Sequence, residues 1–128
     1  MSDIIEVAEQ RSKVVEAYIQ AFEDRNAEAV MALYADEATV EDPYGTEPIK
    51  GRDAIYAFYQ KAMDLNARLS LDGPVRVAGD IAAFPFTVRV TVDGKRQQLE
   101  VIDTFRFDRQ GKIIEMRAFW GPLNSQEI

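Results

Sequence analysis

The types of side chain that can move a proton are limited in this 128-residue chain, because the sequence contains neither cysteine nor histidine. Thiol nucleophiles, histidine-containing triads and Cys/His metal sites are therefore excluded. Acid–base chemistry then falls to Asp, Glu, Tyr or Lys. Three such residues have unusual positions: Asp42 directly before a proline, Tyr18 on an apolar helical stripe, and Asp103 inside an apolar strand pattern.

Asp103 interrupts the apolar face of its expected strand. Side chains alternate between the two faces of a strand, so Val101, Asp103 and Phe105 share one face. Asp-Gly at residues 93–94 predicts a two-residue hairpin turn, and the resulting register places Asp103 opposite Phe84. A charged carboxylate there would lose several kcal/mol of hydration. We therefore expect burial to raise the pKa of Asp103 and make it a neutral hydrogen-bond donor.

A structural role for Asp103 is an equally open alternative. In that alternative the carboxyl group pairs with a basic residue, caps a loop or is turned outward by a bulge. Arg89 and Arg106 are expected on the other face of their strands, which argues against an ion pair with either of them. The other candidates also have ordinary structural interpretations. Tyr18 and Trp120 can be core residues, and Asp42, directly before a proline, can be part of a turn. No single residue among them indicates a function.

The spacing of apolar residues and the positions of turn-forming residues predict the helices and strands that hold these side chains. Apolar spacing predicts a helix over residues 4–25, and Asn26 is expected to cap a second helix that reaches Tyr34. A short strand over residues 39–41 and a third helix over residues 52–64 follow. The second half predicts strands at 67–71, 75–78, 81–92, 95–107 and 112–120. The expected fold is α+β, a single domain over residues 1–128, with three helices on one face of a curved, mainly antiparallel sheet and a ligand pocket between the layers.

Charge and hydropathy limit the partners of the chain. The formal net charge is −7, which argues against binding to nucleic acid or anionic membranes. The start of the sequence does not have the pattern of a signal peptide, and the apolar run 29–35 is too short to span a membrane. We therefore expect a cytoplasmic protein without membrane insertion.

Four segments together carry a resemblance to a known family. They are YADEATVEDPYG, AIYAFY, VIDTFRFD and MRAFW, spread over most of the chain. In combination and spacing they resemble the bacterial Δ5-3-ketosteroid isomerases. The resemblance implies the cone-shaped fold shared with nuclear transport factor 2, a homodimer, and no metal or cofactor.

The resemblance also implies roles for individual residues. Tyr18 and Asp103 match the family's oxyanion-hole donors, Asp42 matches its general base, and Tyr34 and Tyr59 match the tyrosines that support the oxyanion-hole tyrosine. Trp120 matches a residue that can hydrogen-bond the base. The residues expected to contact substrate are Phe58, Phe84, Phe86, Val88, Leu99, Val101, Met116 and Trp120.

The implied reaction converts Δ5-3-ketosteroids to Δ4-3-ketosteroids. Asp42 would carry a proton from C4 to C6, while Tyr18 and protonated Asp103 stabilise the intermediate dienolate. Two alternatives remain open: a related polyketide cyclase or dehydratase, and a non-catalytic module that binds an apolar ligand. The outward faces of the last two long strands mix apolar and charged residues, which predicts the homodimer interface there: Glu100, Ile102, Thr104, Arg106, Glu115, Arg117 and Phe119.

Overall fold

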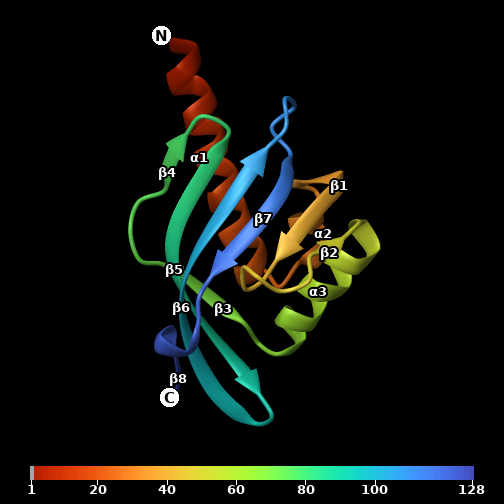
Figure 1. Cartoon of the computed structure of the whole chain (residues 1–128), viewed down its shortest axis with the longest axis vertical. Helices are drawn as coiled ribbons and strands as arrows, with labels where there is room; N and C mark the ends of the chain where they lie inside the picture. Colours follow the sequence, from red (N-terminus) through yellow and green to blue (C-terminus); the bar gives the residue numbers. More distant parts are fainter. Residues whose placement is uncertain (1) are drawn as a thin grey trace.

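The computed structural model describes residues 2–128 as three helices packed on one face of a curved sheet (Figure 1). The helices are α1 (Ser2–Glu23), α2 (Ala27–Met31) and α3 (Arg52–Asp64). The strands are β1 (Tyr34–Glu41), β2 (Ile49–Lys50), β3 (Arg68–Leu71), β4 (Arg76–Ala78), β5 (Ile81–Val92), β6 (Lys95–Phe107), β7 (Ile113–Phe119) and β8 (Ser125–Glu127). A short 3-10 turn, η1 (Pro122–Asn124), precedes β8. The α+β architecture expected from the sequence is confirmed.

The sheet has the order β2-β1-β7-β6-β5-β3, with β4 on β5 and β8 on β6. Among the described pairs, β1 with β7 is parallel and the others are antiparallel. The long β5–β6 hairpin extends past the helices at one end, while the start of α1 projects at the other (Figure 1). This arrangement leaves one face of the sheet covered by helices and the opposite face of β6 and β7 open.

The helices form where the sequence supplies a buried stripe. Ile55, Tyr59 and Met63 recur every four residues along α3, and all three are buried against the sheet. The side chain of Asn26 accepts a hydrogen bond from the backbone N–H of Ala29 and caps α2, as predicted. The core therefore lies between the helical stripes and the inner face of the sheet.

The β5–β6 register agrees with the prediction from the turn. Asp93 and Gly94 both have positive φ, at 53° and 78°, which is the geometry of a two-residue type I′ turn. Phe84 lies opposite Asp103, and the pairing runs without interruption through the hairpin. The turn thus determines which side chains of β6 face the helices.

One element prediction was wrong. The second helix does not reach Tyr34; it ends at Met31, and Tyr34 instead begins β1. The backbone N–H of Ile113 donates to the carbonyl of Leu33 at 2.9 Å, so pairing with the distant strand β7 recruits this segment. Strands β2 and β8 were not predicted either. Within residues 2–128, none of the helices combines the length and apolar character needed to span a bilayer.

Candidate active site

A cavity opens between the helices and the inner face of the sheet. The cavity has a volume of about 140 Å³ and opens to solvent at its mouth. Its lining combines residues of α1, α3, β3, β5 and β6 with the ends of β1 and β7: Tyr18, Phe22, Asp42, Phe58, Tyr59, Ala62, Ala67, Leu69, Phe86, Val88, Val90, Leu99, Val101, Asp103 and Trp120. No lysine or arginine is among these lining residues, so the cavity suits a flat apolar molecule with few polar groups.

Asp103 contributes a buried carboxyl group to this cavity. Its side chain is almost completely buried, and its strand is paired regularly on both sides, with Phe84 of β5 and Ala118 of β7. Burial raises the pKa of Asp103 well above its ordinary value, and the nearby charge of Asp42 raises it further. A neutral, protonated Asp103 can donate one hydrogen bond.

The surroundings of Asp103 do not support the structural alternatives. The local ladder has no bulge at this residue, because the β6–β7 irregularity lies between Arg106 and Phe107. Among the described residues, no ion pair involves Asp103, and its buried Oδ1 has no hydrogen-bond partner. A buried polar atom without a partner is costly, so this oxygen indicates a place where a ligand group completes the site.

Three tyrosine hydroxyls form a chain that ends at the cavity. The hydroxyl groups of Tyr18 and Tyr59 are hydrogen-bonded at 3.3 Å, and those of Tyr59 and Tyr34 at 2.5 Å. Burial is the main reason why the pKa of each phenol lies well above its ordinary value, so all three remain protonated. In this structure the Tyr18 O–H donates to Tyr59. Hydroxyl groups rotate, and when Tyr34 donates to Tyr59 and Tyr59 to Tyr18, the Tyr18 O–H can donate into the cavity.

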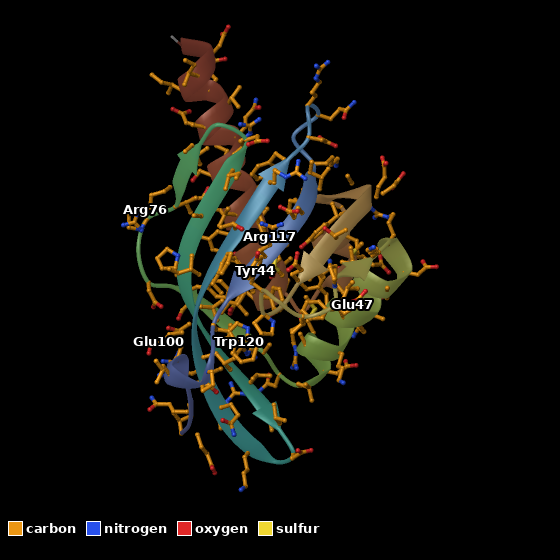
Figure 2. The ribbon with its side chains drawn as sticks, in the orientation of Figure 1. Tyr44, Glu47, Arg76, Glu100, Arg117 and Trp120 are labelled. Carbon is orange, nitrogen blue, oxygen red and sulfur yellow. The ribbon has the colours of Figure 1, made fainter. Side chains whose placement is uncertain are left out.

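Asp42 lies at the other polar position of the cavity, directly after β1. The indole N–H of Trp120 donates to its Oδ1 at 2.7 Å. Burial raises the pKa of Asp42, and the indole hydrogen bond opposes that rise because it stabilises the carboxylate. Parallel pairing of Glu41 with Arg117 places the ends of β1 and β7 side by side, and Trp120 follows the end of β7 (Figure 2).

The cavity therefore brings together one carboxyl group that can act as a base and two groups that can donate hydrogen bonds. Asp42 can accept a proton from a bound molecule, and Tyr18 and Asp103 can donate hydrogen bonds to an oxygen that gains negative charge. Among residues 2–128, no group of three or more potential metal-ligating side chains was found.

Comparison with known proteins agrees with this reading of the fold. A model of the SnoaL-like domain family matches residues 15–116, which is most of the chain. The chain belongs to the SnoaL-like domain family. The match begins within α1, before Tyr18, and ends at Met116 in β7, so it includes Asp42 and Asp103 but not Trp120.

This SnoaL-like chain has relatives with different names. It is 41% identical to the steroid Delta-isomerase of Nocardioides simplex over 110 residues, which cover 84% of this chain and 87% of that protein. It is 30% identical to the epoxide hydrolase LasB of Streptomyces lasalocidi over 120 residues, which cover 90% of this chain but only 43% of LasB. The solved structure of SalBIII, an epoxide hydrolase/cyclase-like enzyme of salinomycin pyran ring formation, superimposes with a TM-score of 0.88 at 22% identity, covering 94% and 97% of the two chains. That similarity shows the fold alone.

Most residues predicted to contact substrate line the cavity of this SnoaL-like domain: Phe58, Phe86, Val88, Leu99, Val101 and Trp120. Phe84 and Met116 lie instead behind the wall and are fully buried. The Phe84 ring packs on Phe105 at 5.1 Å between ring centres and on Tyr18 at 6.3 Å. Phe84 thus supports the lining from behind, and Met116 is part of the core.

The cavity of the SnoaL-like domain also has lining residues that the sequence reading omitted: Phe22, Ala62, Ala67, Leu69 and Val90. The regular spacing of side chains along a helix or a strand would have predicted two of them. Phe22 lies one helical turn after Tyr18, and Val90 shares strand parity with Val88. The lining therefore extends further along the hairpin, to Val90, than we predicted.

Proposed function

We propose that the chain isomerises Δ5-3-ketosteroids to Δ4-3-ketosteroids by moving one proton from C4 to C6 through a dienolate. The observation that carries this proposal is the buried, unpartnered Oδ1 of Asp103 in a cavity that also presents Tyr18 and Asp42. The steroid Delta-isomerase of Nocardioides simplex, 41% identical to this chain, supports the same substrate class. A fused-ring ketone also suits the apolar lining.

In the proposed mechanism Asp42 is the general base. Its carboxylate takes the proton from C4, and the electron pair of that C–H bond forms a new double bond as the carbonyl electrons move onto oxygen. The same carboxyl group then returns the proton to C6, and the electrons move back to restore the ketone in conjugation. One base therefore performs both transfers, and no net proton is gained or lost.

Tyr18 and protonated Asp103 form the proposed oxyanion hole. Both donate to the ketone oxygen, and these hydrogen bonds strengthen as the oxygen becomes negative. Donors fixed in a dry cavity stabilise such charge more than water does, because they need no reorganisation during the reaction. Once the Tyr18 hydroxyl rotates to donate to the ketone, Tyr59 can donate to Tyr18 in place of the present Tyr18-to-Tyr59 bond, which increases the donor strength of Tyr18, and Tyr34 supports Tyr59 in turn.

The test of this function is turnover of 5-androstene-3,17-dione, followed by the ultraviolet absorbance of the conjugated enone. We expect a steady rise in absorbance that depends on enzyme concentration. Tight binding of a phenolic steroid without turnover would favour a non-catalytic binding module. Activity restricted to polyketide substrates would favour a cyclase or dehydratase.

We also propose that two copies associate through the outer face of β6 and β7. Ile102 and Phe119 face each other across these strands and are 51% and 41% exposed. The exposed ring of Tyr44 stacks on Phe119 with ring centres 5.3 Å apart, and the Arg117 guanidinium lies 5.2 Å from the Tyr44 ring centre on the same face (Figure 2). Such a mixture of aromatic, arginine and charged groups is typical of a two-fold interface.

Light scattering is expected to give twice the chain mass at micromolar concentration. Ile102→Glu should shift the mass to that of a monomer, because it places a charge at the centre of the proposed interface. Ile5→Glu is the matched control, since Ile5 is similarly exposed but lies in α1, on the helical side of the sheet. A monomeric parent protein, or equal dissociation by both changes, would contradict the interface. The cytoplasmic location expected from the sequence stays a prediction.

A further inference from the structure

Arg52, the first residue of α3, lies outside the cavity but holds the backbone of the tyrosine chain. Its Nη1 donates to the carbonyl of Tyr34 at 2.9 Å, and its Nη2 donates to the carbonyl of Met31 at 3.1 Å. We propose that Arg52 is a positioning residue that sets turnover by holding Tyr34 against Tyr59 and so tuning Tyr18. This inference rests on the proposed isomerase function.

The geometry of α3 connects Arg52 with Tyr59. The two residues are seven positions apart, which is about two helical turns and about 10 Å along the axis, so they project from the same side. Arg52 holds the main chain of Tyr34, and the Tyr59 hydroxyl holds the Tyr34 hydroxyl at the other end of the side chain. One rigid helix therefore fixes both ends of Tyr34.

Arg52 bridges a junction at which the regular backbone pairing of the Tyr34 segment is interrupted. Met31 ends α2, and the carbonyls in the last turn of a helix lack helical partners. The β1–β7 ladder pairs Tyr34 with Ile113 but changes register before it resumes at Thr39. The guanidinium fork satisfies two carbonyls across this junction, which a point charge cannot match. The ion pair of Arg52 with Asp36 adds little, because Asp36 is highly exposed.

The expected consequence is confined to the chemical step. Without the fork, the Tyr34 main chain can shift, and the hydrogen bond from Tyr34 to Tyr59 lengthens. Tyr59 then polarises the Tyr18 hydroxyl less, so the oxyanion is less stabilised in the transition state. The apolar walls do not change, because Arg52 does not line the cavity. Turnover should fall while the KM for the ketone stays near that of the parent.

Arg52→Met tests this inference because it keeps an unbranched apolar stem and deletes the donors. We expect kcat to fall about 5- to 10-fold, the size of effect that weakening one neutral hydrogen bond produces. Arg52→Lys should recover part of the loss by holding one carbonyl. In a Tyr34→Phe background, Arg52→Met should cause little further loss, because both changes act through the same hydrogen bond.

Arg25→Met is the matched control. Arg25 Nη2 donates to the carbonyl of Met63 at 2.8 Å, so it fastens the opposite end of α3 without touching the tyrosine chain. Thermal unfolding of both variants reports general destabilisation. Equal losses of kcat in Arg25→Met and Arg52→Met would overturn the inference, as would a full additional loss in the Tyr34→Phe background.

A binding measurement separates this inference from the proposed function. A phenolic steroid bears its hydroxyl oxygen where the ketone oxygen is expected, so its affinity reports the Tyr18 donor without any turnover. Arg52→Met should weaken that affinity about 5- to 10-fold, and Arg25→Met should leave it unchanged. If the parent protein fails to isomerise the ketone, the proposed function fails, and the affinity pattern still decides the role of Arg52. Unchanged phenol affinity in Arg52→Met would contradict the positioning role.

Discussion

Asp42→Asn is expected to lower turnover by about 10⁴-fold or more. The amide keeps the shape and the acceptor oxygen for the Trp120 indole, but it cannot accept a proton as a base. Loss of a general base typically costs about 10²–10⁴-fold, and this sequence has no histidine that could substitute. Steroid affinity should survive, because the apolar lining is unchanged. The measurement is turnover of the ketosteroid together with binding of a non-reacting steroid.

Glu41→Gln is the matched control for Asp42→Asn. Glu41 is the neighbouring carboxylate, but it forms an ion pair with Arg117 at 3.6 Å and does not line the cavity. Its replacement should leave turnover within a few-fold of the parent. Near-normal turnover by Asp42→Asn, with a large loss in Glu41→Gln, would transfer the base role to Glu41.

The pH profile follows from the same assignment. Burial raises the pKa of Asp42, and the protonated carboxyl group cannot accept a proton. The value of kcat/KM should therefore be constant above this raised pKa and fall as the pH drops through it. Trp120→Phe removes the hydrogen bond that lowers the pKa of Asp42, so the acidic limb should move to higher pH.

Asp103→Asn is expected to keep much of the activity, whereas Asp103→Leu should lose about 10²–10³-fold in turnover. Asn retains a donor at this position, and Leu keeps similar bulk without one; removing one oxyanion-hole donor typically has that cost. Tyr18→Phe should resemble Asp103→Leu, because it too removes one donor to the same oxygen. Equal damage by Asn and Leu, in variants that remain folded, would refute the neutral-donor role.

Stability provides an independent check on the protonation of Asp103. Its pKa in the folded protein lies well above the unfolded value of about 3.9, so the folded state retains a proton that the unfolded chain releases. The contribution of Asp103 to the free energy of unfolding therefore decreases as the pH rises above about 4, until the folded pKa is passed. Asp103→Asn has no such loss. The unfolding free energy of Asp103→Asn minus that of the parent should therefore be larger at pH 7 than at pH 4. Urea denaturation at the two pH values measures this difference.

Local sequence was sufficient to predict the placement of Asp103. Strand alternation gave its face, and Asp93-Gly94 gave its partner, because a two-residue turn determines the register of a whole hairpin. The neighbourhood of Asp42 and Trp120 could not be worked out in this way. It depends on the parallel pairing of β1 with β7, for which no local pattern exists, and it came only from resemblance to a family.

Strand parity also has a limit that Phe84 and Met116 illustrate. It predicts which side chains face the helices, but it does not predict how deep each lies within the curved sheet. Where the helices pack directly on the sheet, an inward side chain is part of the core, as Phe84 is against Phe105. Where the layers separate, along the hairpin, inward side chains such as Val90 line the cavity. The curvature that separates these cases is set by the whole sheet.

The absence of a lysine or arginine among the cavity-lining residues has a consequence for the energetics of the proposed reaction. With Asp42 ionised and Asp103 neutral, the site carries one negative charge before the reaction. Proton abstraction transfers that charge from Asp42 to the substrate oxygen, so the site creates no charge and needs no counterion. Trp120 solvates the charge at its origin, and Tyr18 and Asp103 solvate it at its destination. The barrier then depends on the difference in donor strength between the two ends of the cavity, and the rate should be almost insensitive to ionic strength.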